Sequence, residues 1–183
     1  PAINWLNSYS LYQHKMDRVV CFEIENLNEL KELSKKLLII EIMGKHSNII
    51  LVDKESNKII DSIKHIDSRQ SSIREVFPNK DYFFVKDEKE NILEENYKLP
   101  SEILKVSEPI SMKKFFYTNY LGFSPIVSYE LLHNSNVDSD TNSANLDSES
   151  IRRIDENFVK LVDNIKSENY FPIFIKDDAN NNK

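Results

Sequence analysis

Alternating apolar and polar positions predict that the first half of the chain is rich in β-strands. Residues 18–25, RVVCFEIE, alternate with a period of two, with Val20, Phe22 and Ile24 on one face, which is typical of a half-buried strand. Three more strands are predicted in a meander, near residues 37–43, 48–53 and 58–65. Gly44 and a polar turn at 54–57 separate them.

Two segments beside this meander carry weaker patterns. Residues 27–36, LNELKELSKK, predict a polar turn or a short helix, and DYFFV at 81–85 predicts a final strand. Residues 1–16 contain aromatic side chains but no clear period, so no element is predicted there.

Helix signals replace the strand pattern after residue 86. Pro100 and Pro125 are typical of the first turn of a helix, where proline is tolerated. Residues 111–120 predict a helix with Ser111 as its N-cap and Gly122 at the C′ position.

The last helix is the most regular element of the second half. Apolar residues follow helical spacing over 149–167. The polar run 135–148 before it predicts a loop or a disordered segment, and residues 170–176 predict an edge strand because they contain Pro172.

Strands followed by helices predict an α+β chain. We expect a β-rich, sandwich-like antiparallel core at 1–86, and a helical module at 87–183 that includes the loop 135–148 and the terminal edge strand. Because the chain starts at Pro1 without an initiator methionine, we expect a fragment of a longer protein whose core lacks its N-terminal part.

Charge is distributed unevenly along the 183 residues. The net charge is −6, yet residues 1–85 hold 12 basic and 12 acidic side chains, whereas 86–183 hold 12 and 18. This balance argues against a general nucleic-acid binder but permits a local basic face in the first half. The single cysteine, Cys21, excludes a disulfide framework and indicates a reducing compartment. No apolar run reaches the roughly 18 residues of a membrane span.

Polar residues concentrate at two predicted turns. Asp17-Arg18 precedes a strand, and its guanidinium group suits phosphate, although exposed charge at a strand entry is the commoner explanation. Residues 41–48, EIMGKHSN, predict a hairpin tip from which Lys45, His46, Ser47 and Asn48 project, either as a cradle for an RNA backbone or as an ordinary polar turn.

Other candidate chemistry is sparse. Lys64 and Arg74 extend the basic character, as one face with Lys45 or as separate solvated strand ends. The four histidines and Cys21 show no metal-ligand spacing, so we expect neither a metal nor a cofactor, and a cysteine within an apolar strand predicts packing. The aromatic residues at 115–123 favour a core over base stacking.

Five segments, in one order, carry a family resemblance: MDRVVCFEIE, LIIEIMGKHSNIILVD, IIDSIKHI, SIREVFPNKDYFF and GFSPIVSYELL. They resemble the N-terminal domain of the NFACT family, known in bacteria as fibronectin-binding protein A or RqcH-type ribosome quality-control factors, with NEMF as the eukaryotic relative. The resemblance covers Lys15 to Leu132, and extends more loosely to Lys176.

The resemblance implies a cytoplasmic, RNA-binding protein that is not an enzyme. Family members bind the large ribosomal subunit carrying a stalled peptidyl-tRNA and recruit tRNA, alanyl-tRNA in bacteria, for untemplated C-terminal tailing, while the ribosome makes the peptide bond. It connects Asp17 and Arg18 with tRNA recruitment and Glu41, Ile42 and Met43 with family function. The residues that match the same motif without an assigned role are Lys45, His46 and Asn48.

The resemblance also implies the architecture of the Fpg/MutM DNA glycosylases, a β-sandwich at 18–85 with a helix–two-turn–helix module at 111–134. Those enzymes use an N-terminal proline as nucleophile, so Pro1 keeps a DNA glycosylase/AP lyase open as an alternative. Ala2 argues against it, because a glutamate follows the proline in the glycosylases. A fibronectin-binding adhesin is a second alternative, which the lack of a signal peptide disfavours.

Overall fold

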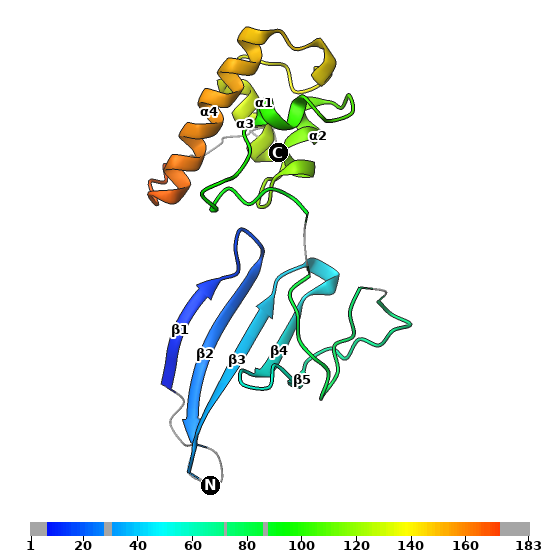
Figure 1. Ribbon diagram of the computed structural model, residues 1–183, viewed down its shortest axis with the longest axis vertical. Coiled ribbons are helices and arrows are strands. Elements are labelled where there is room, and N and C mark those ends of the chain that lie inside the picture. Colours follow the sequence, from blue (N-terminus) through cyan, green and yellow to red (C-terminus); the bar gives the residue numbers. More distant parts are fainter. Residues whose placement is uncertain (1–6, 28–30, 72, 86–87, 173–183) are drawn as a thin grey trace, which may run out of the picture. The chain divides into compact units, whose positions relative to one another are not determined.

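The computed structural model describes residues 7–27, 31–71, 73–85 and 88–172. The chain divides into a sheet unit, residues 1–89, and a helical unit, residues 90–183. The α+β class is confirmed, since strands fill the first unit and helices the second (Figure 1). Pro1, the nucleophile in the disfavoured glycosylase alternative, lies outside the described residues.

The sheet unit contains one five-stranded antiparallel sheet, whose strands lie side by side in chain order (Figure 1). The strands are β1 (Asn7–Gln13), β2 (Val19–Leu27), β3 (Leu33–Glu41), β4 (Asn48–Asp53) and β5 (Ile59–Ser62). Within the described part of the chain this is the only sheet, so a second layer of the expected sandwich is not seen there. The likeness to Fpg/MutM stays a prediction.

One face of this sheet carries the core. Cys21 pairs with Ile39, which pairs with Ile50, and all three side chains are fully buried. Val76 and Tyr82, from the irregular chain after β5, are buried in the same cluster. The opposite face is also apolar, with Val20, Ile40 and Ile49 in register, but these residues keep part of their surface exposed.

Three expectations for the sheet unit need correction. Strand β1 was not expected, because a register shift between Ser8 and Ser10 interrupts its alternation. Leu33–Lys36 extend β3 instead of forming a turn or helix, since the pairing partner Glu25 attracts Lys35. Residues 81–85 contain only the isolated bridge from Asp81 to Lys58 and no regular strand.

The helical unit contains α1 (Pro100–Leu104), α2 (Met112–Asn119), α3 (Pro125–Asn134) and α4 (Ser148–Lys166). Helix α4 begins after Asp147, whose Oδ1 accepts a hydrogen bond from Ser150 N at 2.7 Å. Its buried stripe, Ile154, Phe158 and Val162, repeats every four residues. Helix prediction by periodicity and proline position is therefore confirmed for this unit.

Two details of the helices differ from expectation. Ser111 occupies the N-cap position of α2, but its hydroxyl makes no capping hydrogen bond. Gly122 has a positive φ of 78°, as expected of a helix stop, although it follows the C-cap residue Tyr120 by two positions rather than one.

The connection from α3 to α4 is ordered, which corrects the expectation of disorder. Its backbone carbonyls at Thr141 and Ser139 accept hydrogen bonds from Met112 N and Lys113 N at 2.9 and 3.0 Å. The short helix η2 (Ser143–Asn145) follows. These contacts satisfy the free N–H groups at the start of α2, so carbonyls of the polar segment 135–148 cap this helix.

The aromatic residues of 115–123 belong to the core of the helical unit. Phe115, Phe116 and Tyr120 are buried, and the rings of Phe116, Tyr120 and Phe123 lie 4.6–6.3 Å from that of Phe158. At the C-terminal end, 170–172 form no strand, and the remainder of the expected edge strand lies outside the described residues. None of the described helices has the length and hydropathy required to cross a membrane.

Candidate nucleic-acid interface

Three connections lie at the same end of the sheet and form what we call the polar end: residues 14–18, 42–47 and 63–65. They meet there because every second turn of an antiparallel meander returns to the same edge. The backbone joins the first two directly, since Ile42 N donates a hydrogen bond to Arg18 O at 2.8 Å. Asp17-Arg18 and the 41–48 segment are therefore neighbours, although 23 positions separate Arg18 from Glu41 in the sequence.

The β1–β2 turn fixes the backbone of Arg18. Asp17 N donates to His14 O at 3.0 Å, and Asp17 Oδ1 accepts from Arg18 N at 2.7 Å. The imidazole of His14 stacks on Phe84, with ring centroids 3.7 Å apart and planes within 2°. Burial lowers the pKa of His14, which favours the neutral form of the ring in this stack. The Asp17 carboxylate therefore holds the main chain of this turn, and the Arg18 side chain is exposed.

The β3–β4 connection is a single 3₁₀ turn, η1 (Gly44–His46). Gly44 has a φ of 59°, a left-handed conformation that favours glycine. Ser47 closes the turn, because its Oγ accepts from Met43 N at 2.9 Å and its N–H donates to Gly44 O at 3.0 Å. The side chains of Lys45 and His46 project into solvent from this turn.

Asn48 is buried, which corrects the expectation that its side chain projects for RNA contact. It is 4 % exposed, and its Oδ1 accepts from Lys64 N and Ile49 N at 2.9 and 3.0 Å. Its Nδ2 donates to Lys64 O at 2.9 Å. Asn48 thus holds Lys64 in place, and Lys64 Nζ in turn donates to Lys45 O at 3.2 Å.

Glu41 and Arg74 are also buried, with side chains 4 % and 11 % exposed. They form an ion pair, and Tyr82 Oη donates to Glu41 Oε1 at 2.9 Å. Burial raises the pKa of Tyr82, and the Glu41 carboxylate raises it further, so the phenol keeps its proton. Arg74 therefore does not join an exposed basic face with Lys45 and Lys64, and that expectation is corrected.

No sequence pattern indicated a role for Tyr82 in this cluster. It lies 41 positions from Glu41, inside a DYFFV run whose pattern predicts a strand. A pairing over that distance follows no period in the sequence.

The exposed groups of the polar end are thus fewer than expected. Arg18, Lys45 and His46 point into solvent, and within the described ranges their side chains have no hydrogen-bond or ion-pair partner. Ile42, whose N–H is bonded to Arg18 O, is exposed as well. Such a surface can bind a phosphate backbone through charge and hydrogen bonds. Across those same ranges, no three acidic, histidine or cysteine side chains cluster to hold a metal.

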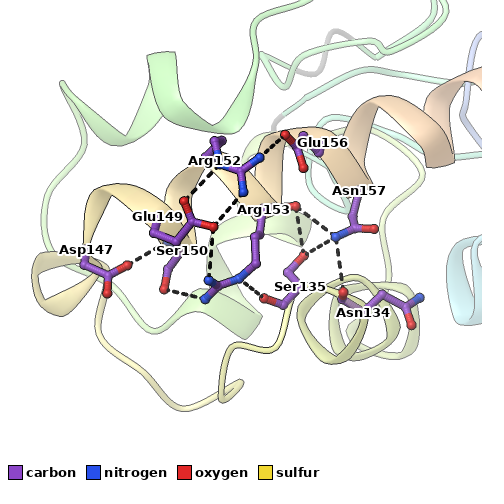
Figure 2. Close-up of polar contacts among 9 residues, drawn as sticks. All are labelled: Asn134, Ser135, Asp147, Glu149, Ser150, Arg152, Arg153, Glu156 and Asn157. Atoms are coloured by element: carbon purple, nitrogen blue, oxygen red, sulfur yellow. Dashed lines mark hydrogen bonds and ion pairs between the residues drawn. The ribbon is translucent and has the colours of Figure 1, made fainter.

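A second polar cluster, in the helical unit, is structural (Figure 2). Arg153 Nε donates to Ser135 O at 2.9 Å, and Asn157 Nδ2 donates to Asn134 O at 3.2 Å, so α4 satisfies the carbonyls at the end of α3. The nearby Arg152 is held by acidic neighbours on its own helix. This cluster leaves no free charge for a ligand.

The fold and the polar end define an α+β protein with a small exposed basic surface on a five-stranded sheet. Residues 9–183 match the family described as NFACT N-terminal and middle domains, and the chain belongs to this family.

Relatives support the same assignment. The Rqc2 homolog RqcH of Streptococcus pneumoniae is 44 % identical over 91 residues, which cover 44 % of this chain and 16 % of that protein. The Rqc2 homolog RqcH of Bacillus subtilis is 44 % identical over 70 residues, or 38 % and 12 % of the two chains.

A solved structure, the N-terminal part of the fibronectin/fibrinogen-binding protein of Streptococcus suis, has a TM-score of 0.66 and 29 % identity. That match covers 86 % of this chain and 53 % of the other, so the chain spans about half of the solved relative and a smaller share of the curated ones.

Proposed function

We propose that this chain is the RNA-binding part of a ribosome-associated quality-control factor. Such a factor binds an obstructed large ribosomal subunit with its peptidyl-tRNA and recruits tRNA, with alanyl-tRNA as the expected species, for untemplated C-terminal tailing of the stalled chain. The ribosome forms the peptide bonds, so the chain itself is not an enzyme. Membership of the NFACT family and the likeness to RqcH proteins support this assignment.

One observation carries the tRNA part of the proposal. The hydrogen bond from Ile42 N to Arg18 O holds the main chain of Arg18, whose side chain is exposed, beside the turn that presents Lys45 and His46. Arg18 and Lys45 offer positive charge without an internal acidic partner among the described residues, and the His46 ring offers hydrogen-bonding nitrogens. Phosphate contacts of this kind position an RNA and make its binding sensitive to salt.

The test measures alanyl-tRNA binding over a range of salt concentrations, using the longest available form of the protein. Arg18→Ala is expected to weaken binding and to reduce the salt slope by about one contact, roughly 0.7–0.9 in log–log units. Lys80→Ala is the control for loss of one exposed positive charge elsewhere, because Lys80 pairs with Glu75 at 2.7 Å and its carbonyl accepts from Ile59 N at the opposite end of the sheet. Equal affinity and slope for the two variants would refute the polar end as the tRNA surface.

Fibronectin binding is the second candidate, because two solved relatives are named as fibronectin-binding proteins. If it applies here, purified protein binds immobilised fibronectin saturably and in high salt, and Arg18→Ala has little effect. Binding that disappears at moderate salt would instead indicate non-specific charge attraction.

A further inference from the structure

The buried cluster of Glu41, Arg74 and Tyr82 lies directly behind the polar end. Glu41 is the last residue of β3, pairs with Val19 on one side and Asn48 on the other, and points to the core face. A carboxylate at such a position is costly unless it is paired and hydrogen-bonded. The cluster provides both kinds of partner.

The contacts join three segments that are distant in the sequence. Arg74 Nη2 donates to both carboxylate oxygens of Glu41, at 2.5 Å to Oε2, and Arg74 Nη1 donates to Phe83 O at 2.9 Å. Tyr82 donates to the same carboxylate, and its ring centroid lies 5.3 Å from Arg74 Cζ. The end of β3, the chain around Arg74 and the chain at 82–83 are thus fixed to one another.

The exposed turn starts at the next residue. Ile42 N hydrogen-bonds Arg18 O, and Met43 N hydrogen-bonds Ser47 Oγ. A displaced Glu41 would therefore move the anchor of Arg18 and the start of the Gly44–His46 turn together. No side-chain contact of Glu41 reaches the solvent side, since its carboxylate is occupied by Arg74 and Tyr82.

We propose that Glu41, Arg74 and Tyr82 are positioning residues for RNA binding at the polar end. They act through the backbone of Ile42 and Met43 and make no contact with RNA. This inference rests on the proposed function. It assigns different roles to two neighbouring residues: Glu41 is a buried anchor, whereas Ile42 is exposed at the surface.

The experiment separates positioning from contact by the salt dependence of alanyl-tRNA binding. Glu41→Gln retains the side-chain shape but removes the charge that holds Arg74, and it is expected to lower affinity about tenfold, the effect of one misplaced charge-assisted hydrogen bond. Its salt slope stays at the wild-type value because no phosphate contact is lost. Arg18→Ala, in contrast, lowers the slope. Tyr82→Phe removes only one hydroxyl and is expected to give a smaller loss at an unchanged slope.

Amide hydrogen exchange at Ile42 and Ser47 provides a readout that needs no RNA. Faster exchange in Glu41→Gln and Tyr82→Phe, with the exchange of Ile50 unchanged, is expected from loosening of the turn alone. A folded Glu41→Gln variant with wild-type exchange and affinity would overturn the positioning role, and a reduced salt slope would show direct contact. If Glu41→Gln does not fold, Tyr82→Phe decides by the same criteria. If wild-type protein and Arg18→Ala bind tRNA equally, the proposed function fails, while exchange still tests the positioning.

Discussion

Replacing Asn48 with alanine removes three hydrogen bonds, two of which join β4 to the segment after β5. The side chain is 4 % exposed and bonds the N–H and the carbonyl of Lys64 as well as Ile49 N. Each neutral hydrogen bond contributes about 0.5–1.5 kcal/mol, so together they contribute about 2–4 kcal/mol to the free energy of unfolding. The upper end of this range is not reached, because Lys64 is an exposed residue and its carbonyl keeps a second donor, Ser62 Oγ, at 3.0 Å.

The assay is urea unfolding of the full chain, followed through NMR signals of the sheet unit. Asn48→Asp is an informative companion, because it keeps the acceptor but places a carboxylate oxygen against the Lys64 carbonyl, and it is expected to lose at least as much stability. Glu55→Ala is the control, since Glu55 is exposed in the β4–β5 turn at the other end of the sheet. A loss for Asn48→Ala within about 0.5 kcal/mol of the control would refute the reasoning.

Four further predictions concern separate parts of the chain. Phe158→Ala, at a fully buried site, is expected to destabilise the helical unit by about 3–5 kcal/mol in calorimetry. Gly44→Ala is expected to cost about 1 kcal/mol in thermal unfolding, because φ is 59° but no atom lies within 4 Å of an added Cβ; a much larger loss would indicate a clash. The pKa of His14 is lowered by burial, so its stabilisation is complete above the ordinary value of 6.5 and is lost as the pH falls through the lower folded value. Urea unfolding on either side of pH 6.5 should show a steeper loss at low pH for wild type than for His14→Gln. Burial also raises the pKa of the Cys21 thiol, so a disulfide reagent should label it only as fast as the sheet unit opens, and rapid labelling of native protein would contradict this.

The parts of the fold that follow a local period could be predicted from the sequence. The β4 strand at 48–53 has the expected bounds, and α4 differs from the expected helix by one residue at each end. The β1 strand could not be found, because its bulge breaks the period, and 27–36 looked like a turn because its pairing partners lie in another strand. Pairing between strands is tertiary information, and it can override local propensity.

The candidate site shows a similar division. The sequence placed Lys45 and His46 at a turn, and they are exposed there. It could not distinguish them from Asn48 and Arg74, since polar residues near turns look alike in sequence. Burial depends on Tyr82 and Lys64, which come from later parts of the chain.

The chain-order arrangement of the sheet has a consequence for synthesis. Each strand pairs only with its neighbour along the chain, and each of the two units is a continuous stretch of sequence. Pairing can therefore advance hairpin by hairpin as residues leave the ribosome, with short loops that cost little entropy to close. The cluster of Glu41, Arg74 and Tyr82 is completed late, because it waits for residue 82 to emerge. The turn at the polar end would thus acquire its final position only when the sheet unit is nearly complete, before any of the helices has left the ribosome.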